Sequence, residues 1–139
     1  MSPTKQSAGF TAEEKAAMRA RAKELKLAEE GEAAIAAALE KMSPADRAVG
    51  ERIHALVTKA APELTPKTWY GMPAYANSDG KVICYFKNAG KFKMRYSEFG
   101  FQDTAKLDDG TMWPIVYAIT KLTKADETKI AQLVKQAVS

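Results

Sequence analysis

The feature that most constrains the fold is a change in hydrophobic periodicity near Pro66. Before this residue, apolar side chains recur every three to four positions, which is the spacing of one face of an α-helix. After it, aromatic and β-branched residues alternate with polar ones between clusters of turn-forming residues, a pattern typical of β-strands. Helices followed by an antiparallel sheet and a closing helix predict an α+β domain of two layers.

The helix signals divide the first half of the chain. Thr11 and Glu14 have the spacing of a capping box, so a helix is expected from Ala12 to about Glu30. Its apolar stripe is thin, which predicts that this helix lies on the surface as an extension. Gly31 is expected to end it and to separate it from a second helix, Glu32 to Met42.

Two further helices have clear start signals and core-facing stripes. Ser43 followed by Pro44 predicts an N-cap and a first helical residue, with the helix ending near Ala60. Thr123 and Asp126 predict the cap of a C-terminal helix. Both helices are expected to pack against the sheet.

Length, charge and cysteine content limit the class of protein. A chain of 139 residues is one domain's worth, and we expect a disordered tail at 1–10, a helical extension at 11–31 and an α+β domain at 32–139. The formal net charge of +4 is small for a nucleic-acid-binding protein. The single cysteine and the lack of a long apolar run predict a reduced, cytoplasmic protein outside the membrane.

Four strands are expected in a twisted antiparallel meander. The turn-forming clusters are Asn77 to Gly80 and Asn88 to Gly90. The strand candidates are Lys67 to Ala76, Lys81 to Lys87, Lys91 to Tyr96 and Met112 to Thr120. Pro114 lies in the last of these, so that strand is expected at an edge or a bulge.

The turn length predicts which side chains share a face, because neighbouring residues of a strand point to opposite sides. A three-residue turn at 88–90 pairs Phe86 with Phe92, Cys84 with Met94 and Val82 with Tyr96 on the core side. The opposite side is then expected to present Tyr70, Met72, Ile83, Tyr85, Lys93 and Arg95.

Aromatic, thioether and cationic groups together suit an anionic, partly planar ligand or a peptide. Two alternatives stay open for this face. It is a ligand-binding surface, or it is covered by the first helix or by a second subunit.

The sequence offers no assembled catalytic or zinc site, which favours a protein that is not an enzyme. His54 is the only histidine and falls inside a helix, and Cys84 falls on the core side, where burial raises the pKa of a thiol. One histidine and one cysteine are too few soft ligands for structural zinc. No glycine-rich phosphate loop is present, and the Asp108-Asp109-Gly110 run is typical of a turn.

Three segments carry a resemblance to a known family. They are Trp69-Tyr70-Gly71-Met72-Pro73-Ala74-Tyr75, Lys91-Phe92-Lys93-Met94-Arg95-Tyr96, and the Trp113-Pro114 strand with the terminal helix. Over roughly residues 32–139 the chain resembles the YdhG-like family, grouped with the YjbR and frataxin-like (CyaY-like) proteins.

The resemblance implies a compact α+β fold and a role as an intracellular iron chaperone, with carboxylates such as Asp108, Asp109 and Glu98 as ligands. Frataxin-type iron binding uses a ridge of carboxylates, whereas the acids here are scattered and the expected ligand face is basic. The first hypothesis is therefore a non-enzymatic protein without a cofactor that binds a small anionic or aromatic ligand or a peptide. The iron chaperone is the alternative.

Overall fold

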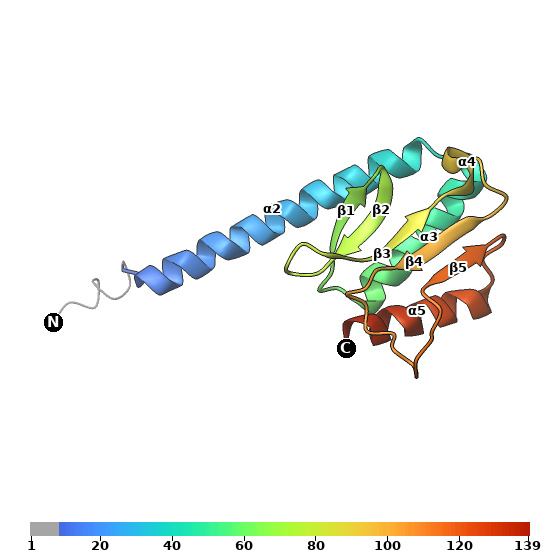
Figure 1. Ribbon diagram of the computed structural model, residues 1–139. Helices are drawn as coiled ribbons and strands as arrows, with labels where there is room; N and C mark the ends of the chain where they lie inside the picture. Colours follow the sequence, from blue (N-terminus) through green and yellow to red (C-terminus); the bar gives the residue numbers. More distant parts are fainter. Residues whose placement is uncertain (1–8) are drawn as a thin grey trace.

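The computed structural model describes residues 9–139, so the tail expected to be disordered lies outside the described residues except for its last two positions. The helices are α2 (Ala12–Glu40), α3 (Pro44–Ala60), α4 (Ala89–Phe92) and α5 (Lys124–Val138). The strands are β1 (Thr65–Trp69), β2 (Met72–Ala76), β3 (Val82–Lys87), β4 (Ser97–Phe101) and β5 (Val116–Ile119). These elements are labelled in Figure 1.

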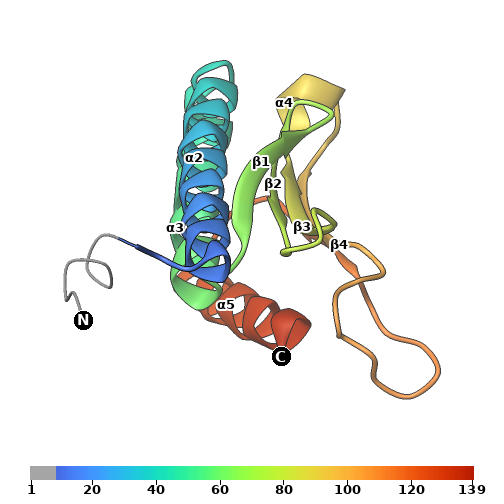
Figure 2. The same cartoon turned by 90° about the vertical axis from the view of Figure 1, so that its left-hand side faces the viewer.

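The five strands form one antiparallel meander in the order β1-β2-β3-β4-β5. Helices α2, α3 and α5 lie on one side of the sheet, so the prediction of a two-layer α+β fold is confirmed (Figure 2). The fifth strand arises because the segment expected as one strand, Lys67 to Ala76, forms two. Tyr70 and Gly71 have φ angles of 51° and 76°, and these two residues form the hairpin turn between β1 and β2.

The core lies between the sheet and the three long helices. Phe86 pairs with Phe99 and Cys84 with Phe101 across β3 and β4, and all four side chains are buried against the helices. The prediction that Cys84 and Phe86 face the core is confirmed. The predicted partners Phe92, Met94 and Tyr96 are wrong, because the strand that pairs with β3 begins at Ser97.

The segment Lys91 to Tyr96 is not a strand. Residues 89–92 form the short helix α4, and Lys93 then adopts a left-handed conformation with φ of 53°. Two hydrogen bonds hold this connection in place, from the Gly90 amide to the Asp46 carboxylate at 2.9 Å and from the Ala89 amide to the Ser97 hydroxyl at 3.0 Å. These contacts favour a helical turn over the extended backbone that the alternating residues suggest.

Helix α2 continues through Gly31, so the predicted break is wrong. A Cβ atom at this position would overlap the backbone carbonyl of Pro66. Glycine therefore stands here because α2 approaches β1 closely, and the cost of a glycine inside a helix is offset by that contact. The division into an extension and a domain at this point stays a prediction, since one helix crosses it.

The first part of α2 projects from the body of the protein (Figure 1). Residues 12–27 are all exposed, and the capping box of Thr11 and Glu14 forms as predicted. The predicted caps of α3 and α5, Ser43 and Thr123, are also confirmed. None of the helices within residues 9–139 carries an apolar stretch that could cross a membrane.

Candidate functional site

The sheet has a second face, directed away from the helices, which we call the outer face. Within residues 9–139, no helix lies across it (Figure 2). The strand registers place on it, from β1 to β5, Thr65, Lys67, Trp69, Met72, Ala74, Ala76, Val82, Tyr85, Lys87, Glu98, Gly100, Val116 and Ala118. The first helix therefore does not cover this face, and a second subunit stays an alternative.

An aromatic and apolar group, the outer cluster, occupies the part of this face formed by β1 to β3. Its members are Trp69, Met72, Ala74, Val82 and Tyr85. The Trp69 and Tyr85 rings meet edge to face with 5.4 Å between centroids. Burial and the nearby charge of Glu98 raise the pKa of the Tyr85 hydroxyl. Met72, Ala74 and Tyr85 are buried, and Trp69 and Val82 are partly exposed at the surface of the cluster.

Three of the predicted ligand-binding residues lie at or beside this cluster. Met72 and Tyr85 lie within it, as expected. Tyr70 is at the tip of the β1–β2 turn, where 78% of its surface is exposed and its ring lies 5.1 Å from the Trp69 ring. The structure thus brings together part of the predicted set.

The placement of Ile83 on the outer face is wrong. Only 3% of its surface is exposed, and it packs in the main core. Tyr75 pairs with Cys84 and Ala76 pairs with Val82, so Ile83 is an extra residue without a partner in β2. This β-bulge reverses the alternation, so the placement of Val82 on the core side is also wrong, and Val82 packs against the outer cluster.

Lys93 and Arg95 do not pair with β3, so their predicted register with Tyr85 and Ile83 is also wrong. Lys93 ends α4, and the Arg95 guanidinium lies 5.0 Å from the centre of the Tyr96 ring. Both side chains are exposed. They belong to the end of the sheet where α4 and the β1–β2 turn lie (Figure 1).

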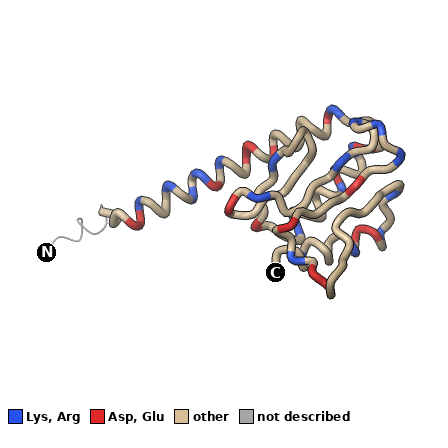
Figure 3. Tube along the Cα trace, viewed as in Figure 1, with Lys and Arg blue, Asp and Glu red and all other residues tan. Residues whose placement is uncertain are grey.

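Two further lysines of the basic run Lys81 to Tyr96 lie at this end. The Nζ atoms of Lys87 and Lys91 lie 4.9 Å and 5.5 Å from the centre of the Phe92 ring. Lys91 also donates a hydrogen bond of 3.1 Å to the Tyr70 carbonyl. Together with Lys93 and Arg95, these lysines form a basic rim (Figure 3).

A signal for Trp69 was present in the sequence. Treating Tyr70-Gly71 as a two-residue turn pairs Trp69 with Met72 and places both on one face. The basic rim also had a signal, because the segment from Lys81 to Tyr96 contains lysines and an arginine but no acid. The position of these charges at the end of the sheet depends on the helical turn of α4.

The carboxylates of the iron alternative are not gathered in one place. Asp108 and Asp109 are exposed in the segment between β4 and β5, and Glu98 is on the outer face. Within residues 9–139, no three or more histidine, cysteine, aspartate or glutamate side chains form a group that could hold a metal ion. Iron binding stays a prediction, and Fe²⁺ titration with and without Asp108→Asn and Asp109→Asn tests it.

The side chains of His54 and Cys84 both make contacts within the fold. The His54 ring connects two elements, with Nδ1 2.8 Å from the Tyr75 hydroxyl and Nε2 2.9 Å from the Glu32 carboxylate. Cys84 is fully buried, and its burial raises the pKa of the thiol. Neither residue lies on the outer face.

Comparison of the chain with protein-family models, with curated proteins and with solved structures gave no match. The resemblance to the YdhG-like family therefore stays a prediction.

Proposed function

We propose that this protein is a non-enzymatic binding protein of the cytoplasm whose outer cluster and basic rim bind a small anionic, partly planar ligand. The observation that carries the proposal is the Trp69–Tyr85 ring pair on a sheet face that no described helix covers. The partly exposed Trp69 ring and the exposed Tyr70 ring offer stacking area to a planar group, with the buried Tyr85 ring supporting Trp69 from within the cluster. Two lysine Nζ atoms lie within 5.5 Å of the centre of the Phe92 ring.

The charges of the basic rim supply the preference for an anion. Four cationic side chains lie at one end of the outer face, and the acid on this part of the sheet is Glu98, opposite Lys87 in the register. Ammonium and guanidinium groups hydrogen-bond strongly to phosphate or carboxylate oxygens. A ligand with a ring over Trp69 and an anionic group toward α4 would satisfy both halves of the site.

Trp69 fluorescence provides a direct test. Trp113 packs against the core, so a Trp113→Phe variant leaves Trp69 as the only tryptophan. Adenosine 5′-monophosphate, adenosine and ribose 5-phosphate then serve as probes with both groups, the ring alone and the phosphate alone. The nucleotide is expected to quench Trp69 saturably and to bind at least about tenfold more tightly than either partial probe.

Charge variants separate binding from stability. Lys93→Glu combined with Arg95→Glu, and separately Lys87→Gln, should weaken nucleotide binding while leaving thermal unfolding nearly unchanged, because these side chains are not buried. Lys135→Gln on α5 is the matched control. Equal binding by all variants, or no saturable quenching, would refute the proposal.

A further inference from the structure

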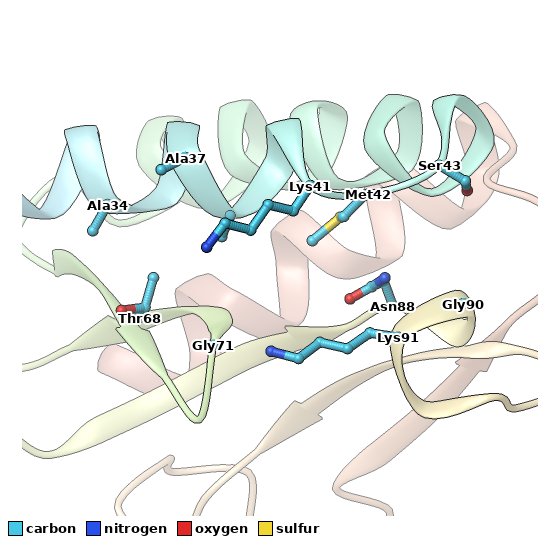
Figure 4. A pocket seen from close by; sticks show the side chains of 11 residues that line it. Ala34, Ala37, Lys41, Met42, Ser43, Thr68, Gly71, Asn88, Gly90 and Lys91 are labelled. Carbon is cyan, nitrogen blue, oxygen red and sulfur yellow. The ribbon is translucent and has the colours of Figure 1, made fainter.

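A groove lies between the C-terminal end of α2 and helix α4, next to the β1–β2 turn (Figure 4). Its volume is about 750 Å³, within the range of small-ligand sites. The wall on α2 consists of Ala34, Ala37 and Ala38, whose small side chains leave the space open. We call it the Asn88 groove, after the polar residue buried in it.

Asn88 is buried, with 3% of its surface exposed, and half of its amide is already used. Its Nδ2 atom donates a hydrogen bond of 3.2 Å to the Asp46 carboxylate, which also accepts one from the Gly90 amide at 2.9 Å. These contacts fix the orientation of the amide, because the carboxylate accepts only from the nitrogen side.

The Asn88 carbonyl oxygen therefore points toward the groove, between Met42 and Lys91, and is itself buried (Figure 4). Within the described residues this Oδ1 atom has no hydrogen-bond partner. A buried acceptor without a donor destabilises the fold, so a molecule that supplies an O–H or N–H group here stabilises it. Met42 is a flexible side chain that can move aside for such a molecule, and Lys91 can do so by giving up its hydrogen bond to the Tyr70 carbonyl.

The groove also holds two cations. Lys41 enters it from the end of α2 and Lys91 from α4, on the opposite wall (Figure 4). Within residues 9–139, neither ammonium group forms an ion pair. Their charges favour an anionic occupant.

The carbonyl groups at the end of α2 accept hydrogen bonds from Arg47 and not from the Lys41 ammonium. Arg47 donates hydrogen bonds to the carbonyls of Leu39, Glu40 and Met42, at 3.1, 3.0 and 3.2 Å. The guanidinium of Arg47 thus completes the helix end, and the Lys41 ammonium stays available for a ligand.

We propose that the Asn88 groove binds a small anion that carries hydroxyl groups. The anionic group lies between Lys41 and Lys91, and a hydroxyl donates to the Asn88 Oδ1 atom. A hydroxyl fits better than an ammonium donor, because two lysines repel a second positive charge. A carboxylate and a phosphate share this chemistry, and the test distinguishes them.

Titration of the full chain, followed by NMR signals of the Asn88 side-chain amide and of the backbone amides lining the groove, tests the proposal. The probes are gluconate and glucose 6-phosphate, with hexanoate as the anion without hydroxyls and glucose as the uncharged polyol. Either hydroxylated anion is expected to saturate these signals below about 10 mM, at least about tenfold more tightly than hexanoate or glucose. The tighter of the two identifies the anionic group.

Variants locate the site. Lys41→Gln should weaken binding about tenfold, whereas Lys23→Gln, with the same charge change on the exposed part of α2, should leave it unchanged. Ala38→Leu fills the groove and should abolish binding, and Ala36→Leu on the exposed side of the same helix is its control.

Three results would overturn the proposal. They are the lack of saturation by both hydroxylated anions, equal binding of hexanoate, and an ordered water on the Asn88 Oδ1 atom that neither anion displaces. Lys91 belongs to both the groove and the basic rim, so the variants that separate the two sites avoid it: Lys41 and Ala38 line the groove, whereas Trp69 and Lys87 do not.

Discussion

The ring of Tyr85 lies over Gly100, the residue directly opposite it on β4. A Cβ atom at Gly100 would overlap Cζ and Oη of this ring. Gly100→Ala should therefore destabilise the protein by about 1–3 kcal/mol, because the tyrosine must leave its position in the outer cluster. Urea unfolding followed by circular dichroism measures the loss.

The same overlap predicts coupling between the two positions. Tyr85→Ala removes the ring, so the further cost of Gly100→Ala in that background should fall to within about 0.5 kcal/mol of zero. An unchanged cost would mean that something other than the ring excludes a side chain at position 100.

Gly31→Ala is expected to destabilise the protein although alanine is the better helix former. The added methyl group meets the carbonyl of Pro66, a backbone atom that cannot rotate away. The repulsion should outweigh the helix preference of about 1 kcal/mol and leave a net loss of about 1–3 kcal/mol in the free energy of unfolding.

Ala20→Gly is the control for that experiment, since it lies in the exposed part of the same helix. It should cost about 1 kcal/mol or less, the intrinsic difference between the two residues. If Gly31→Ala instead stabilises the chain, the close packing of α2 on β1 is wrong.

The local signals of the sequence predicted the ends of elements well. Caps depend on residues three positions apart, and those of Thr11, Ser43 and Thr123 all form. Two of the errors, the helix break at Gly31 and the strand from Lys91 to Tyr96, came from interactions distant in sequence. Gly31 was expected to end a helix because its contact with Pro66 is invisible in a linear pattern.

The candidate site was predicted only in part for the same reason. Met72 and Tyr85 lie on the outer face because alternation within a strand is local. Ile83, Lys93 and Arg95 were misplaced because a single bulged residue and a helical turn changed the register. Neither the bulge at Ile83 nor the helical turn of α4 has a sequence signal as strong as that of a helix cap.

The stability of α5 should depend on pH through Asp126. The Thr123 amide donates a hydrogen bond of 3.0 Å to this carboxylate, and that bond holds the pKa of Asp126 below its ordinary value. Because the folded state favours the ionised form, the contribution is complete above the unfolded pKa of about 4 and is lost as the pH falls through the folded pKa.

Asp126→Asn should therefore be less stable than the parent chain at neutral pH, and the difference should shrink in acid. Thermal unfolding measured from about pH 7 down to about pH 2 follows this change. A difference that stays constant over that range would contradict the capping role of the carboxylate.

Cys84 should be unreactive in the folded protein. Its side chain is 0% exposed, and burial raises the pKa of the thiol, so the reactive thiolate is scarce at neutral pH. A chromogenic disulfide reagent should modify it at least about 100-fold more slowly than in urea-unfolded chain. Ser78→Cys, in an exposed turn, provides the fast-reacting comparison, and equal rates at both positions would contradict the buried placement.

The close contact at Gly31 also determines how far the start of α2 reaches. A helix rises about 1.5 Å per residue, so Ala12 stands about 28 Å from the point where α2 meets the sheet. A dye attached at Ala12, on the helix itself, would stand at a distance from both proposed binding surfaces that the length of the helix sets. The chain thus contains its own molecular ruler, against which the approach of a labelled ligand to either surface can be measured.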